Sequence, residues 1–238
     1  MQAIVLRRNN FRENDQIITF YTREAGKLEL LARGIKKIAS KNSPHLSLGS
    51  LVNMEMANGK EIDHLTKAVS IDSRAKLRSE LDKATTVSKA LDFTDRILES
   101  KQIDEGVFDL LDGWLVYVLE KNILANQMLY GYMLCLLSQL GFNPELEQCV
   151  NCGATKECKG FSNQLGGIVC NACSQNNNEI IELDDGRLQT IQILNSADWE
   201  KINDLPNDEN LFMLITEFAQ YCGNKKIRFS PLKSVNIS

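Results

Sequence analysis

Two Cys-x-x-Cys pairs offer the most specific chemistry in this sequence. Cys149 and Cys152 form the first pair, Cys170 and Cys173 form the second, and seventeen residues separate them. Each pair can lie on a tight turn and present two thiolates, so together they predict a tetrahedral site for one metal ion. Iron also accepts four sulfur ligands, but zinc is the commoner structural choice. We therefore expect Zn²⁺ at this site.

This metal site is expected to be structural, because four cysteines leave no coordination position open for a substrate. A nucleobase deaminase would need H-x-E and P-C-x-x-C, whereas the two histidines occur in "HLS" and "HLT" and Val169 precedes Cys170. The alternatives are disulfide bonds or free buried thiols. Cys158, between the two pairs, is a further candidate ligand.

Basic residues form a second candidate site, near the start of the chain. Residues 1–80 hold 14 Lys and Arg against 9 Asp and Glu, whereas the remainder holds 13 against 22. Such an excess suits a polyanion. The candidate DNA-binding residues are Arg33, Lys36, Lys37 and Lys41, then Arg7, Arg8 and Lys27, with Arg12 and Arg23 nearby. The alternative is that these charges only solvate a loop.

Single-stranded nucleic acid also needs flat side chains on which bases can stack. The available rings in the basic region are Phe11, Phe20 and Tyr21. Phe20 and Tyr21 would point to opposite faces of one strand, so one of them is expected to serve the core.

Enzymatic function is not predicted. The sequence contains no G-x-x-x-x-G-K-[ST] or G-x-G-x-x-G phosphate loop, and two histidines do not make a Ser-His-Asp set. Met1 leads directly into "AIVLR" without the features of a signal peptide, which favours the cytoplasm and a metal site over a disulfide framework. The most apolar run, residues 126–144, is too short and too interrupted to cross a bilayer.

Strand-like patterns position the basic residues. Five runs show β-branched enrichment and partial alternation: "AIVLRR", "QIITFYT", "KLELLAR", "SLVNMEM" and "EIDHLTKAVSI". Gly26 suits a short hairpin, and Asn58-Gly59 is typical of a two-residue type I′ turn. Five short antiparallel strands predict a small barrel, either of the oligonucleotide-binding (OB) type or SH3-like.

Helical periodicity begins near residue 75. A stripe of Leu77, Leu81, Ala84, Val87, Leu91, Thr94 and Leu98 predicts one helix of about six turns. Val107 to Val118 continue the pattern, residues 126–144 suit the centre of a bundle, and Gly141 and Pro144 end that run. "DDGRLQTIQILN" and "NLFMLITEFAQYCG" predict further helices. The expected fold class is α+β, multidomain: a barrel over residues 1–75, then a helical domain over 76–238 with a zinc module inserted at 146–176.

Two stretches resemble the RecO family of bacterial DNA repair proteins, the recombination mediators. The first is "AIVLRRNNFRENDQIITFYTREAGKLELLARGIKKIASK", which is similar to the family's opening barrel. The second is "MLCLLSQLGFNPELEQCVNCGA" continuing to "GGIVCNACS", which is similar to the family's hydrophobic helix and zinc-binding cysteines. The order of these parts agrees over essentially the full chain.

The resemblance implies an N-terminal OB-fold barrel and a helical domain interrupted by a four-cysteine zinc module. It implies a non-enzymatic protein that binds single- and double-stranded DNA and anneals complementary strands. With its partner RecR, such a protein helps load RecA onto DNA coated by single-strand binding protein (SSB), in the cytoplasm at the nucleoid. A protein-protein adaptor with a small barrel and a zinc ribbon remains the alternative.

The family also docks the acidic, hydrophobic C-terminal tail of SSB. Such a tail needs an apolar slot with a cationic rim. The segment "NLFMLITEFAQYCG" followed by Lys225, Lys226 and Arg228 is a candidate, although cations after a helix often only complement its dipole.

Overall fold

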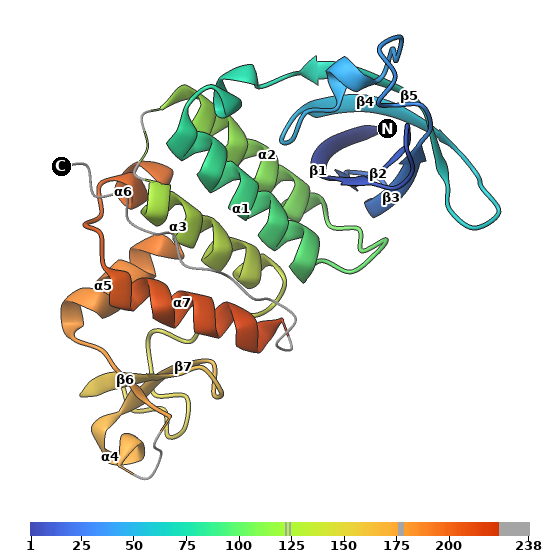
Figure 1. Ribbon diagram of the computed structural model, residues 1–238. Coiled ribbons are helices and arrows are strands. Elements are labelled where there is room, and N and C mark those ends of the chain that lie inside the picture. Colours follow the sequence, from blue (N-terminus) through green and yellow to red (C-terminus); the bar gives the residue numbers. More distant parts are fainter. Residues whose placement is uncertain (122, 124, 176–178, 224–238) are drawn as a thin grey trace. The chain divides into compact units, whose positions relative to one another are not determined.

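The computed structural model describes residues 1–121, 123, 125–175 and 179–223 (Figure 1). The chain forms two compact units, Met1–Ile123 and Leu124–Ser238, and each is described by itself. The first unit contains the barrel and the two helices that follow it. The domain boundary expected near residue 75 therefore stays a prediction.

The first unit begins with a closed five-stranded barrel in the order β1-β2-β3-β5-β4. Its strands are β1 (Gln2–Asn10), β2 (Gln16–Thr22), β3 (Gly26–Ala32), β4 (Leu51–Ala57) and β5 (His64–Asp72). All neighbours are antiparallel except β3 and β5, which are parallel and join through Leu31 and His64. This closed Greek-key order confirms the OB-type barrel.

Alternation along the strands fills the barrel. Every second residue points inward, and the buried core consists of Ala3, Val5, Ile18, Phe20, Leu28, Leu30, Ala32, Ile35, Leu46, Val52, Met54, Leu65 and Ala68. A bulge in β1 between Val5 and Arg7 shifts the register with β2. The five predicted strands are confirmed, each within a few residues of its predicted limits.

Two glycines of the barrel, Gly26 and Gly59, occur where the chain approaches itself closely. Gly26 ends the β2–β3 hairpin at φ +66°, and a Cβ there would lie 2.1 Å from the Gln102 carbonyl oxygen. The predicted type I′ turn at Asn58-Gly59 is wrong, because residues 58–63 form a longer loop between β4 and β5. A Cβ on Gly59 would lie 1.8 Å from the Ile62 carbonyl oxygen, and the Gly59 N–H donates to the Asp63 carboxylate. Gly59 therefore allows the 58–63 loop to close on itself and does not form a two-residue hairpin turn.

The helices of the first unit are η1 (Ser43–His45), η2 (Ala75–Arg78), α1 (Leu81–Ile97) and α2 (Glu105–Glu120). The predicted continuous helix from Leu77 to Leu98 is therefore interrupted. Leu77 is buried within η2, whereas Leu81 is exposed at the start of α1. In Figure 1, α1 and α2 run side by side next to the barrel.

The second unit is built around α3 (Ala125–Gln139), which packs on α5 (Asp185–Leu194), α6 (Trp199–Asn203) and α7 (Glu209–Cys222). Aspartate side chains cap the last three helices at Asp184, Asp198 and Asp208. The sequence did not predict α6, which has only five residues. Within the described part of the chain, no helix combines the length and apolarity needed to span a membrane.

The end of α3 follows the predicted stop signal. Gly141 has φ +89°, its N–H donates to the Ser138 carbonyl at 3.0 Å, and the Phe142 N–H donates to the Leu137 carbonyl at 2.9 Å. These two bonds form a Schellman motif. The chain then enters a small three-stranded sheet formed by β6 (Cys158–Ser162), β7 (Gly167–Cys170) and β8 (Ile181–Glu182), with α4 (Asn171–Ser174) after β7.

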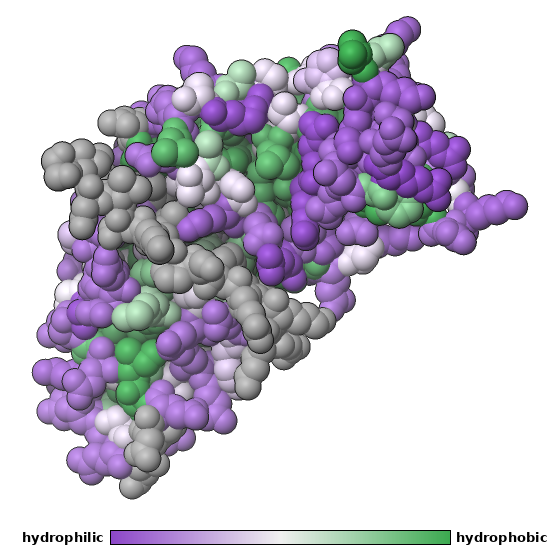
Figure 2. Space-filling view, viewed as in Figure 1, coloured by the Kyte–Doolittle hydropathy of each residue, from purple (hydrophilic) through white to green (hydrophobic). Residues whose placement is uncertain are grey.

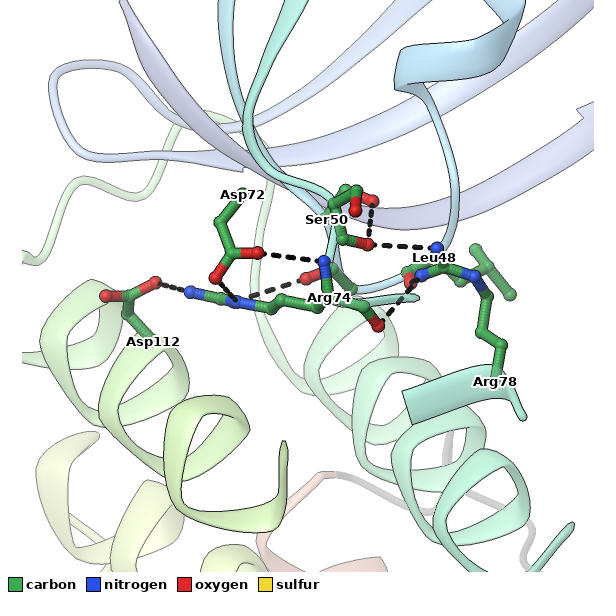
Figure 3. Close-up of polar contacts among 8 residues, drawn as sticks. Leu48, Ser50, Asp72, Arg74, Arg78 and Asp112 are labelled. Carbon is green, nitrogen blue, oxygen red and sulfur yellow. Dashed lines mark hydrogen bonds and ion pairs between the residues drawn. The ribbon is translucent and has the colours of Figure 1, made fainter. Parts of the chain in front are cut away.

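A buried guanidinium joins the barrel to α2. Arg74 follows β5 in the left-handed conformation, at φ 48°, and is 2% exposed. Its guanidinium donates to the Gly49 carbonyl at 3.2 Å and to the Asp112 carboxylate of α2, while its N–H donates to Asp72 at 2.9 Å (Figure 3). Arg78 adds bonds to the Leu48 and Ser73 carbonyls. One side chain thus links three segments.

Replacing Arg74 by Ala should lower the free energy of unfolding by about 2–3 kcal/mol, because the Asp112 carboxylate and the Gly49 carbonyl lose their buried partner. Urea denaturation with an unchanged m-value measures this. The matched control is Arg96→Ala, since Arg96 pairs with Asp92 at the surface of α1 and its loss should cost only about 0.3–0.5 kcal/mol. Equal losses in the two variants would refute a special role for Arg74.

Candidate nucleic-acid interface and metal centre

The segment 33–41, here called the basic loop, leaves the barrel after β3. Arg33, Lys36, Lys37 and Lys41 are all exposed, and so is Ile38 between them. Among the described residues, no side chain forms a hydrogen bond or an ion pair with the three lysine ammonium groups. In Figure 2, hydrophilic residues cover most of the visible face of the barrel. These lysines are therefore free to meet phosphates.

The basic loop lies against the loop that joins β1 to β2. The Gly34 N–H donates to the Asp15 carboxylate at 2.7 Å, and the Lys36 N–H donates to the Asn14 carbonyl at 3.1 Å. Phe11 in the β1–β2 loop is 47% exposed, and the Arg12 guanidinium lies 5.0 Å from its ring centroid. An exposed ring and a further cation thus belong to the same surface as the basic loop.

Phe20 and Tyr21 are not available for base stacking. Phe20 lies in the barrel core, as alternation predicts for one of the two rings. Tyr21 is also fully buried, because it packs on Phe108 of α2 and its hydroxyl donates to the Asp104 carbonyl at 3.1 Å. Burial, together with the Asp104 charge, raises the pKa of Tyr21 to about 12. The helices cover a barrel face that the sequence alone left open.

Arg7, Arg8 and Lys27 are engaged within the first unit. Arg7 and Lys27 both pair with Asp95 of α1, at 3.2 and 3.6 Å. The Arg8 guanidinium donates to the Gln16 side chain and to the Leu46 carbonyl. Half of the Arg7 side chain stays exposed, whereas Lys27 is largely buried. DNA binding by these three residues stays a prediction.

Sequence reasoning missed Lys60 as a candidate. Lys60 is exposed in the β4–β5 loop. Its neighbour Gly59 lies against the His64 imidazole, which in turn contacts Arg33 at 3.2 Å. The interpretation of Asn58-Gly59 as a two-residue turn left no long loop beside Arg33 in which Lys60 could be a candidate. The polar sequence "NGKEID" was the signal for a longer loop.

The four predicted cysteines come together at the base of the small sheet. The Cys149, Cys152, Cys170 and Cys173 sulfur atoms all lie within 4.8 Å of one another. The Cys152–Cys170 sulfur distance is 3.7 Å. A tetrahedral ion with metal–sulfur bonds of about 2.3 Å needs sulfur atoms about 3.8 Å apart. The four side chains fit such an ion.

A tight turn holds the first cysteine pair, whereas the second pair lies at the end of β7 and in α4. The Cys149 N–H donates to the Ala154 carbonyl at 2.7 Å, and the Gly153 N–H donates back to the Cys149 carbonyl at 2.8 Å with Gly153 at φ +75°. Cys158 is outside the cluster, and its thiol donates to the Ala154 carbonyl at 3.3 Å. The geometry favours the paired cysteines over Cys158 as ligands.

The crowded thiols influence one another's protonation. Burial alone would raise the pKa of Cys149, but hydrogen bonds from neighbouring backbone N–H groups lower it to about 6. A backbone N–H also lowers the pKa of Cys152, yet hydrogen bonding with the other three thiols outweighs this effect and raises it to about 12. Four thiols this close cannot all lose their protons unless a cation compensates the negative charges. A divalent ion would supply that compensation.

The predicted slot for an acidic tail is only partly described. Its helix is α7, on which Met213 and Tyr221 are exposed. The predicted rim residues Lys225, Lys226 and Arg228 lie outside the described residues. This slot stays a prediction.

Comparison with known proteins identifies the family. The profile described as Recombination protein O N terminal matches residues 1–74, and the profile described as Recombination protein O C terminal matches residues 78–234. The chain belongs to the recombination protein O (RecO) family. RecO relatives named "DNA repair protein RecO" include one from Symbiobacterium thermophilum, 31% identical over 83% of this chain and 80% of its own length. Another, from Desulforamulus reducens, is 27% identical over 96% of this chain and 91% of its own length.

Membership of the RecO family supports a role in DNA repair and is compatible with DNA binding. It agrees with the resemblance drawn from the opening barrel and from the cysteine segment. The basic loop of the barrel and the cysteine cluster are thus the two candidate functional sites among the described residues.

The metal site predicts that the purified protein carries about one equivalent of zinc per chain, measured by elemental analysis. Cys170→Ser should lower this content well below one equivalent, because a hydroxyl is a poor zinc ligand. Cys158→Ser is the matched control and should retain the full content, since Cys158 lies outside the cluster. Loss of zinc in the Cys158 variant alone would contradict the assignment.

Proposed function

We propose that this protein is a recombination mediator that binds single- and double-stranded DNA and anneals complementary strands. The observation that carries the proposal is the basic loop, whose lysines project from an OB-type barrel and have no partner among the described residues. Free cations on a barrel edge suit the phosphate backbone. Family membership adds independent support.

Such a surface should bind DNA without reading its sequence. Contacts to phosphates carry no base information, and each neutralised phosphate releases counterions. Binding is therefore expected to weaken steeply as salt rises. Phe11, exposed beside the basic loop, offers one ring for base stacking and favours unpaired strands.

Annealing follows from the same contacts. Two complementary strands repel each other as polyanions, and a protein that neutralises phosphates on both lowers that repulsion. The step requires binding and release without breaking a covalent bond, so the proposed activity is not enzymatic.

In the cell, the protein would act with RecR to promote loading of RecA onto single-stranded DNA coated by SSB, in the cytoplasm at the nucleoid. It would dock the acidic C-terminal tail of SSB, with α7 as one wall of the slot. The support for these partners is the family to which the chain belongs.

The zinc module is proposed as a structural staple and not as a DNA surface. Its small core consists largely of its own cysteines, since Cys149 and Cys170 are buried with Val169 and pack against Cys158 and Cys173. Charges in the segment are mixed: Lys156 and Lys159 against Glu145, Glu147 and Glu157. Zn²⁺ would add to the stability that this small hydrophobic core provides.

Replacing Lys36, Lys37 and Lys41 together by Glu should weaken binding of a labelled mixed-sequence single-stranded oligonucleotide about 100-fold at low salt. Three lost phosphate contacts should also make the slope of log K against log salt shallower by about 2. Fluorescence anisotropy over a salt series measures both quantities.

The matched control reverses three exposed lysines elsewhere, Lys76, Lys156 and Lys159, and so changes the net charge equally. It should lose much less affinity. Equal effects would show that overall charge, and not the basic loop, drives binding. If the wild-type chain bound no DNA even at low salt, the protein-protein adaptor would become the better proposal.

Annealing of two complementary labelled strands, followed by fluorescence quenching, should be slowed by the same Lys-to-Glu triple variant to near the uncatalysed rate. The physical reason is that acidic side chains in the basic loop repel both strands. An unchanged annealing rate in the triple variant, with the control variant also unchanged, would exclude the barrel from annealing.

A further inference from the structure

One edge of β5 is covered by side chains instead of by a strand. The parallel pairing between β3 and β5 is limited to Leu31 and His64. Beyond that point the Asn42 carboxamide takes the place of a neighbouring peptide group: its Nδ2 donates to the Thr66 carbonyl at 3.3 Å, and its Oδ1 accepts the Ala68 N–H at 3.1 Å. Asn42 directly follows the basic loop, so these two bonds fasten the end of that loop to the barrel.

The two histidines of the chain make similar attachments to β5. His45 accepts the Ser70 N–H on its Nδ1 at 3.3 Å. At the other end of the basic loop, the Arg33 guanidinium lies 3.2 Å from the His64 Nε2. Because a guanidinium can only donate, that nitrogen must be the acceptor. His64 thus contacts the first residue of the basic loop, and His45 fastens to β5 the short segment that follows the loop.

Backbone contacts complete the arrangement. Asp15 accepts the Gly34 N–H, and Asn14 accepts the Lys36 N–H, so the first half of the loop is also held by the β1–β2 loop. The loop is therefore bonded at both ends and along one side, while its lysine side chains stay exposed. The segment thus combines a backbone attached by hydrogen bonds with exposed lysine side chains.

We infer that Asn42, His45 and His64 are positioning residues that hold the basic loop in its DNA-binding conformation. This inference rests on the proposed DNA binding. None of the three needs to touch DNA. A loop that is already ordered loses little conformational entropy on binding, whereas a released loop must be ordered in the complex and so binds less tightly. The number of cations near the phosphates is the same in both cases.

Asn42→Ala should change DNA affinity without changing the number of phosphate contacts. The variant should bind the single-stranded oligonucleotide about tenfold more weakly than the wild type, because the loop must be ordered on binding. The salt slope should be unchanged, since every lysine is retained. A change in slope would mean that Asn42 acts through phosphate contacts, and an unchanged affinity would overturn the inference.

Amide hydrogen exchange tests the same attachment without DNA. In the Asn42 variant the Ala68 N–H should exchange faster, while amides in the β1–β2 ladder should keep their protection. Asn53→Ala is the matched control, because Asn53 is an exposed asparagine on β4 of the same barrel. It should change neither exchange at Ala68 nor DNA affinity.

His64 provides a second, independent pair of variants. His64→Gln keeps an acceptor oxygen for Arg33 and should retain most of the affinity, whereas His64→Leu removes the acceptor and should lose affinity with an unchanged salt slope. Equal binding by the two variants would overturn the role given to His64. Absence of DNA binding by the wild-type chain would instead overturn the proposed function on which this inference rests.

Discussion

The packing of the barrel against α1 and α2 depends on one buried cation, the guanidinium of Arg74. Arg74 is buried where the chain leaves β5, and a buried guanidinium requires acceptors on every side. The Arg74 guanidinium donates to the Gly49 carbonyl and to Asp112 on α2, and it pairs with the Asp72 carboxylate at 3.7 Å. Asp95 does the same from α1, as a carboxylate shared by two cations of the barrel. The positive charges of this region consequently divide into those that hold the unit together and those that project into solvent.

This division limits what charge counting can say about function. The excess of basic residues before residue 80 indicated a polyanion-binding surface on the barrel. Several of those residues, however, form ion pairs with carboxylates of the same unit. The basic loop differs because its lysines have no such partner among the described residues. A phosphate surface is thus better defined by cations without internal partners than by net charge.

Much of the fold and of the metal site could be predicted from sequence because the signals are local. Alternation predicted the five strands, Gly26 the first hairpin, Gly141 the end of α3, and the Cys-x-x-Cys spacing the sulfur cluster. The wrong predictions arose where contacts outside the local sequence pattern determine a residue's environment. Tyr21 looked available for stacking until α2 covered it, and Asn58-Gly59 looked like a hairpin although Ile62 and Asp63 close a longer loop. The attachments made by Asn42 and the histidines are of the same kind, because each joins β5 to a residue twenty or more positions away in the sequence.

The barrel and the cysteine segment differ in what stabilises them, and this difference would make one of them depend on the supply of metal. The barrel encloses thirteen buried hydrophobic residues. Among the described residues, the cluster around the cysteines contains three buried residues, Cys149, Val169 and Cys170, and two of these are ligand candidates. If an ion supplies the missing cohesion, the stability of that segment follows the supply of free zinc by mass action. A cell starved of zinc would then keep a folded barrel while the cysteine segment loosened, so that metal scarcity would affect one part of the protein and spare the other.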